Sequence, residues 1–69
     1  MKERIAILTH LGISIDYLED AISEYKELRQ LISEGHSVDD LEAKQTQKRA
    51  DGAMASAMRF LERSKKKAL

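Results

Sequence analysis

The chain has 69 residues, no cysteine and no proline, and its 12 basic and 12 acidic side chains cancel to a formal net charge of zero. This length predicts one small domain (residues 1–69), and the lack of cysteine excludes disulfides and cysteine-based zinc sites as a source of stability. With 35% charged residues and only three glycines, the composition is typical of an all-α protein. The longest apolar run, Ile5–Leu8, is too short for a membrane span or a signal peptide, so we expect a cytoplasmic protein.

The first predicted break in helical structure is Gly12–Ser14, where a glycine that can end a helix precedes a serine that can cap one. We therefore expect helices at 2–11 and 15–34, or one bent helix if the break is weak. This outline also matches a helix-turn-helix reader of DNA. However, residues 15–25 carry four acids and no base. Because phosphate contacts need Lys or Arg, we expect no DNA reading by this element.

The helix predicted at 15–34 has two faces of different character. Its apolar residues recur at three- and four-residue steps and cover an arc of roughly 200°, about twice what one partner helix needs. Its acids form a stripe opposite that arc, which is either an ordinary solvated face or an anionic surface for a basic partner. The stripe consists of Asp16, Asp20, Glu24, Glu27 and Glu34.

The second predicted break, Glu34–Asp40, is stronger. Gly35 is expected to end one helix, and Ser37 to cap the next, with Asp39 and Asp40 in the first turn where the helix dipole favours acids. This predicts a helix at 38–66. Its narrow apolar seam consists of small and flexible residues, namely Ala43, Gln47, Ala50, Ala53, Met54, Ala57, Met58, Phe60, Leu61 and Ala68.

Folding the chain back at Gly35–His36 makes an antiparallel helical hairpin, with Leu28 near Ala43 and Leu11 near Phe60. The same fold sets the acids of residues 16–24 beside the basic end of the second helix, so hydrophobic and charge patterns agree. Because part of the wide apolar arc stays uncovered, we expect a homodimer that forms a four-helix-bundle-like assembly. The predicted core and dimer residues are Leu18, Ala21, Ile22, Leu28, Ile32, Ala50, Met54, Ala57 and Leu61.

The expected function is binding to another protein, as an inhibitor or adaptor that occludes a functional surface of a larger partner. The acidic stripe would supply charge complementarity, and the tyrosines at the edge of the apolar arc, with Leu31, would supply apolar contacts. The predicted partner-binding residues are Asp16, Tyr17, Asp20, Glu24, Tyr25, Glu27 and Leu31.

Two other binding functions remain open. A nucleic-acid-binding dimer would use the basic outer face of the second helix, formed by Lys44, Lys48, Arg59, Arg63 and Lys66. Alternatively, the bases in the last turns of this helix, within residues 58–69, complement the helix dipole and pair with the acids of the first helix. The chain would also suit an antitoxin or scaffold subunit.

No pattern indicates catalysis or a cofactor. His10 and His36 lie at different breaks without metal-ligand spacing, so we predict no metal site. The serines occupy capping or helix-surface positions, and nothing in the sequence pairs a nucleophile with a base. We therefore predict that the protein is not an enzyme.

In length, in the turn near Gly35 and in seam spacing, the chain resembles the Rop-like family of helical-hairpin dimers. It has no match to that family's RNA-contacting residues, so only the layout is implied. In length and helical plan it also resembles small phage-encoded quorum-sensing anti-activators. That resemblance implies action in the host cytoplasm on a LuxR-type transcriptional regulator, at its DNA-binding region, or on a pilus assembly ATPase.

Overall fold

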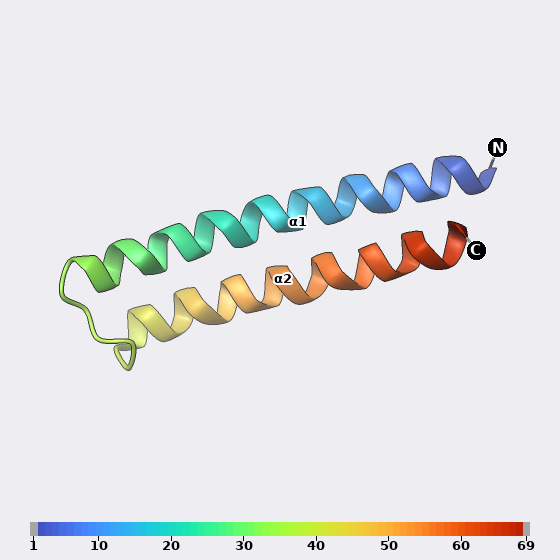
Figure 1. Ribbon diagram of the computed structural model, residues 1–69. Coiled ribbons are helices and arrows are strands. Elements are labelled where there is room, and N and C mark those ends of the chain that lie inside the picture. The colour runs from blue at the N-terminus through green and yellow to red at the C-terminus, as the bar shows by residue number, and fades with distance from the viewer. Residues whose placement is uncertain (1, 69) are drawn as a thin grey trace.

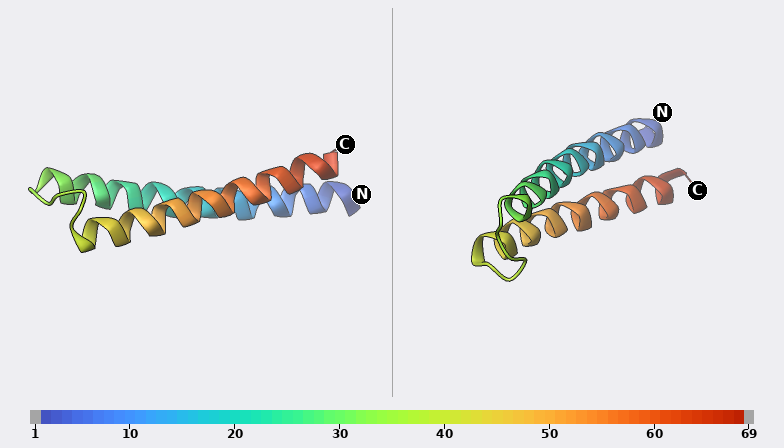
Figure 2. Two further views of the ribbon diagram at one scale, coloured as in Figure 1. Left: turned by 90° about the horizontal axis from the view of Figure 1, so that it is seen from below. Right: turned by 60° about the vertical axis from the view of Figure 1, so that its left-hand side comes forward.

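The computed structural model describes the backbone of residues 2–68 and the side chains of residues 2–66. It consists of two long helices, α1 (Lys2–Ser33) and α2 (Leu41–Ala68), which pack side by side in opposite directions. The two ends of the chain lie together at one end of the hairpin and the connection lies at the other (Figure 1). The rod measures 51 × 14 × 12 Å, and its helices cross at a shallow angle (Figure 2). The predicted all-α helical hairpin is confirmed.

Helix α1 runs through Gly12–Ser14 without interruption, so of the two alternatives expected for this segment the single helix is correct, and it spans residues 2–33. Ser14 is no N-cap, because its side chain is fully buried and its hydroxyl donates a hydrogen bond to the His10 carbonyl at 2.8 Å. Packing of this segment against α2 outweighs the helix cost of Gly12, which is about 1 kcal/mol. A continuous helix also removes the turn that a helix-turn-helix requires.

Helix α1 ends where the sequence predicted, at a Schellman motif around Gly35. This glycine has a φ of 103°, and its N–H donates to the Ile32 carbonyl at 3.1 Å. The next N–H, from His36, donates to the Leu31 carbonyl at 3.0 Å. Both bonds satisfy carbonyls that the helix end would leave unpaired, and the left-handed backbone suits glycine.

Helix α2 begins at Leu41, three residues later than predicted, because Ser37 opens a separate turn. The Ser37 hydroxyl accepts from the Asp39 N–H at 3.2 Å, and the Asp40 carboxylate accepts from the Ser37 N–H at 3.0 Å. Asp40 is the actual N-cap, since its carbonyl accepts the first helical bond, from Lys44 at 2.9 Å. The connection is therefore centred on Ser37 and not on Gly35–His36, which shifts α2 along α1 by less than one helical turn.

Small residues form the seam between the helices. Ala43, Ala50, Ala57 and Ser64 follow one another at seven-residue steps along α2, and all four are buried. Three buried hydroxyls bond to carbonyls of their own helix: Ser14, Thr46 (to Glu42, 3.0 Å) and Ser64 (to Leu61, 2.7 Å). A seven-residue repeat keeps one face of each helix on its partner, and small side chains let the helices approach closely.

The large apolar side chains of the predicted core lie at the edges of this seam. Ala21, Ala50 and Ala57 are buried, whereas Leu18, Leu28, Met54 and Leu61 are half-buried. Ile22 and Ile32 are 53% and 39% exposed on the single hairpin, so their role in a dimer stays a prediction. The side chain of Ala68 lies outside the described residues.

Candidate functional site

The hairpin has two flanks, one on each side of the plane through its helix axes, and they differ in chemistry. Consecutive residues of α1 leave the seam on opposite sides: Glu24 contacts Arg49, whereas Tyr25 contacts Asp51. Residues three, four or seven positions along a helix from one of these contacts lie on the same side of that helix, and this spacing assigns the other residues to a flank. The polar flank comprises Tyr17, Asp20, Glu24, Glu27, Arg49, Ser56, Phe60 and Arg63. The apolar flank comprises Leu8, Leu11, Ile15, Leu18, Ile22, Tyr25, Asp51, Met54, Met58 and Leu61.

Arg49 organises the polar flank. Its Nε donates to the Glu24 carboxylate at 3.0 Å, and its Nη2 lies 3.7 Å from a Glu27 oxygen and donates to the Thr46 hydroxyl at 3.2 Å. The Arg49 and Glu27 side chains are each 52% exposed. A pair this open to water stabilises a fold by about 1 kcal/mol at most. Its main effect is to neutralise two acids of the predicted stripe.

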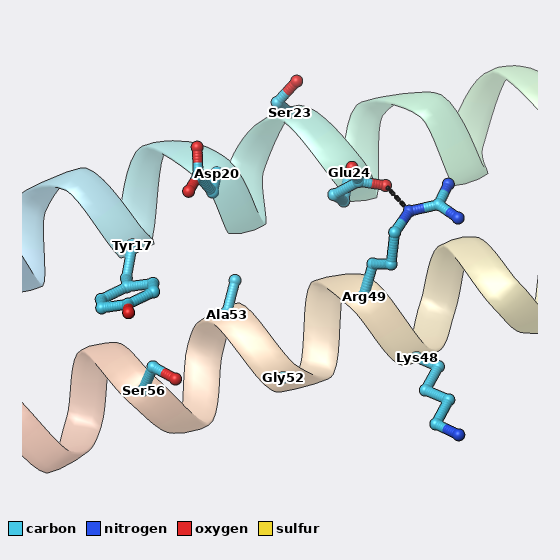
Figure 3. A pocket seen from close by; sticks show the side chains of 9 residues that line it. All are labelled: Tyr17, Asp20, Ser23, Glu24, Lys48, Arg49, Gly52, Ala53 and Ser56. Carbon is cyan, nitrogen blue, oxygen red and sulfur yellow. Dashed lines mark hydrogen bonds and ion pairs between the residues drawn. The ribbon is translucent and has the colours of Figure 1, made fainter.

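Beside this ion pair the polar flank has a shallow open groove of about 350 Å³. Tyr17 lies between the two helices, Ser23 points away from α2 and Lys48 points away from α1 (Figure 3). The groove is open to solvent, unlike an enclosed small-molecule pocket. Its lining residues are Tyr17, Asp20, Ser23, Glu24, Lys48, Arg49, Gly52, Ala53 and Ser56.

An aromatic cluster closes the groove on the side of the chain ends. The Tyr17 ring stacks on Phe60, with 6.0 Å between centroids and 15° between planes, and His10 lies 6.0 Å from the same ring at 45°. The Arg63 guanidinium carbon lies 4.9 Å from the Phe60 centroid, a cation–π contact. His10 Nδ1 is buried, with no hydrogen-bond partner among the described residues. Tyr17 is thus partly used inside the hairpin, and only its edge is available to a partner.

The predicted partner-binding residues do not form one surface. Asp16 and Asp20 are exposed and make no ion pair with any described residue, whereas Glu24 and Glu27 are bound to Arg49. Leu31 is only 8% exposed, because it packs into the seam, so the hairpin offers little of this side chain to a partner and its contact stays a prediction. Tyr25 belongs to the opposite flank.

On the apolar flank, the Tyr25 hydroxyl donates a short hydrogen bond of 2.6 Å to the Asp51 carboxylate. This bond raises the pKa of the Tyr25 phenol above its usual value, and partial desolvation and the negative charge of Asp51 act in the same direction. The contact ties α1 to α2 and leaves the Tyr25 ring in line with the aliphatic residues of this flank.

The expected pairing of the basic end of α2 with the acids of α1 is wrong, with Arg49 the one exception among the described residues. Residues 16–24 lie level with the middle of α2, about residues 50–58, and not with its basic end. The alternative nucleic-acid residues Lys44, Lys48, Arg59 and Lys66 are exposed, and Arg63 stacks on Phe60.

Within residues 2–66, no three His, Asp or Glu side chains lie close enough together to hold a metal ion. His36 Nδ1 lies 3.2 Å from the Asp40 carboxylate in the connection. Neither described helix is long and apolar enough to cross a membrane. Comparisons with protein-family models, curated proteins and solved structures gave no match to this chain.

Proposed function

We propose that this protein is a homodimeric protein-binding inhibitor or adaptor, which covers a basic functional surface of a larger partner with the polar flank of α1. The observation that carries the proposal is the exposure of Asp16 and Asp20. Asp20 belongs to the polar flank and lines the open groove, and Asp16 lies one helical turn before it on the exposed side of α1. No described base pairs with either acid.

The surroundings of these acids suit recognition of a protein surface. Both acids stand on a long helix that is already formed, so binding needs little ordering of the backbone. Tyr17 offers an aromatic edge at the groove, and Ser23 and Ser56 offer hydroxyls. Negative charge on such a rod would speed encounter with a basic partner and disfavour acidic ones.

A basic functional surface is found on the DNA-binding region of a transcriptional regulator, and such a region, of the LuxR type, is the target we propose in the cytoplasm. A pilus assembly ATPase is a second target implied by the resemblance to anti-activators. In either case the mechanism is occlusion, since the groove and its acids have no arrangement for catalysis.

The test is affinity capture from cell lysate with the whole protein, with and without nuclease. We expect a partner that is retained after nuclease treatment and lost when Asp16→Lys and Asp20→Lys are combined. The matched control reverses two exposed charges on the other helix that do not line the groove, Lys44→Glu and Lys66→Glu, and should keep the partner. A partner that is still captured after both acids are reversed would refute the proposal.

The second candidate function is nucleic-acid binding by α2. It is favoured by one observation: Lys44, Lys48, Arg59 and Lys66 are exposed and make no ion pair with a described acid. Binding of this kind would fall steeply with salt, and Lys48→Glu with Arg59→Glu would abolish it. Recovery from lysate that collapses with nuclease would select this function over the first.

A further inference from the structure

The apolar flank carries an uninterrupted stripe along α1. Its six members follow at steps of three and four, and they are Leu8, Leu11, Ile15, Leu18, Ile22 and Tyr25. Leu8, Ile15 and Ile22 are 62%, 52% and 53% exposed, although each is a large aliphatic side chain. The same spacing continues to Arg4 at one end and Arg29 at the other. The apolar stripe thus has an arginine at each of its two ends.

Helix α2 adds apolar side chains to the same flank over only part of its length. Met54, Met58 and Leu61 continue the three- and four-residue steps from Asp51, and Met58 is 51% exposed. Nearer the connection, the equivalent positions of α2 are polar, with Lys44 and Gln47. The exposed apolar surface therefore has a definite centre along the rod.

Both helices place that centre at the same level. On α1 it lies between Asp16 and Tyr17, which is midway between Leu8 and Tyr25 and also midway between Arg4 and Arg29. On α2 it lies between Ala57 and Met58, midway between Met54 and Leu61. Since the connection is centred on Ser37, these two midpoints are equally far from the turn. The pattern of apolar and charged residues along the rod is therefore the same in both directions. A surface must have this property if it packs against its own copy across a two-fold axis perpendicular to the rod.

We propose that two copies pack apolar flank to apolar flank, with α1 antiparallel to α1 of the second copy and the two connections at opposite ends of the bundle. The inference rests on the proposed homodimer and specifies its arrangement. Ile15 then packs beside Leu18 of the second copy, and Leu11 beside Ile22 of the second copy. Arg4 lies level with Arg29 of the second copy at the solvent-exposed ends, where salt screens their repulsion.

Other arrangements fit the surface less well. With the connections at the same end, the two-fold axis would run along the rod and set α1 of one copy over α2 of the second. Packing α1 on α2 of the second copy would bury Leu8 and Ile22 against the charged or polar positions of α2. In the antiparallel α1 pair, each apolar residue of the stripe packs against an apolar residue of the second copy. Helix α2 adds Met58 of each copy near the two-fold axis.

The arrangement has a functional consequence for the polar flank. Because the two flanks lie on opposite sides of each hairpin, both polar flanks point outward from the bundle, in opposite directions. One dimer would thus present Asp16, Asp20 and the groove twice, and could hold one partner molecule on each side.

Cysteine cross-linking tests the arrangement directly, since the natural chain has no cysteine. The chains Leu11→Cys and Ile22→Cys are prepared separately, then mixed, allowed to exchange and mildly oxidised. Leu11 and its own copy would lie about 16 Å apart along the helix, too far for a disulfide. We expect each chain alone to stay uncrosslinked and the mixture to give a covalent dimer with one chain of each kind. Ser23→Cys, on the opposite side, is the matched control and should not cross-link in any mixture.

Light scattering of the natural protein gives the second readout, with an expected mass of twice 7.8 kDa. Dimerisation should also make the melting midpoint rise with protein concentration. A dimer in which Leu11→Cys cross-links to itself would overturn this arrangement and leave the proposed dimer intact. A mass of 7.8 kDa and a concentration-independent midpoint would overturn both. Neither result touches the charge-reversal test of partner binding, which concerns the other flank.

Discussion

The tripeptide pattern Gly-X-Ser occurs twice in this chain, at Gly12–Ser14 and at Gly35–Ser37, with opposite structural outcomes. The first lies inside α1 and leaves the helix intact, whereas the second ends α1 and opens the connection. Gly35 has a φ of 103° and is the one described residue with a positive φ. The same local pattern is therefore a turn in one place and ordinary helix in the other.

The difference comes from the residues around each pattern. Around Gly12, Leu11, Ile15 and Leu18 continue the apolar spacing without a gap, and Ser14 falls on the buried seam against α2. After Gly35 no apolar spacing continues, and Asp40 supplies an N-cap for a new helix. Tertiary packing therefore overrides a weak local stop signal at the first site and leaves the second in force.

Proline substitution should separate the two sites most strongly. Ile13→Pro would remove a hydrogen bond from the interior of α1 and clash with the preceding turn, at a cost of about 3 kcal/mol or more. Val38→Pro is the matched control, because Val38 is 64% exposed and is the second residue of the turn Ser37–Asp40, a position that favours proline. Urea melts followed by far-UV circular dichroism would compare the two variants.

We expect Ile13→Pro to lose much of the helical signal or to unfold at low urea, and Val38→Pro to change the free energy of unfolding by less than about 1 kcal/mol. Equal tolerance of both prolines would mean that Gly12–Ser14 is a turn in solution. That result would restore the two-helix interpretation of residues 2–34.

Alanine at the two glycines should give effects of opposite sign. Gly35→Ala forces a side chain into a left-handed backbone and should destabilise the protein by about 1–2 kcal/mol. Gly12→Ala should stabilise it by about 0.5–1 kcal/mol, because alanine favours the helix and an added Cβ meets no atom within 4 Å apart from the neighbouring backbone of its own helix. Thermal melts at one fixed protein concentration would measure both. A destabilising Gly12→Ala would contradict a continuous α1.

The two glycines also mark how far the sequence predicted the fold. Apolar spacing, the Gly35 stop and the small-residue seam were enough for two antiparallel helices. The position of α2 along α1 was not, because Ser37 resembles an N-cap even in its bond from the Asp39 N–H, and only the start of helical bonding at the Asp40 carbonyl shows that Ser37 opens a separate turn. An error in the start of α2 moves every cross-helix pair by about three residues.

The candidate site was predicted less well than the fold, because a helical wheel gives the face of a residue but not its partner across the seam. Glu24 and Tyr25 were assigned to one surface, yet they leave the seam on opposite sides and contact Arg49 and Asp51. Leu31 was assigned to the surface although its spacing from Ala21 and Leu28 fits the seam. The seven-residue repeat of Ala43, Ala50, Ala57 and Ser64 would have fixed the seam and, with it, both flanks.

The serines that close the two patterns should give the smallest contrast. Ser37→Ala removes the hydroxyl that accepts from the Asp39 N–H and should cost about 0.5–1.5 kcal/mol. Ser14→Ala removes a hydroxyl that bonds only to a carbonyl of its own helix and places alanine in a seam that is already rich in alanine. Because alanine is also the better helix former, we expect this change to lie within about 0.5 kcal/mol of zero or to stabilise. Thermal melts of both variants would show which substitution destabilises the protein more. If Ser14 were a helix cap, Ser14→Ala would be the more costly change, because the loss of a helix cap costs about 1 kcal/mol.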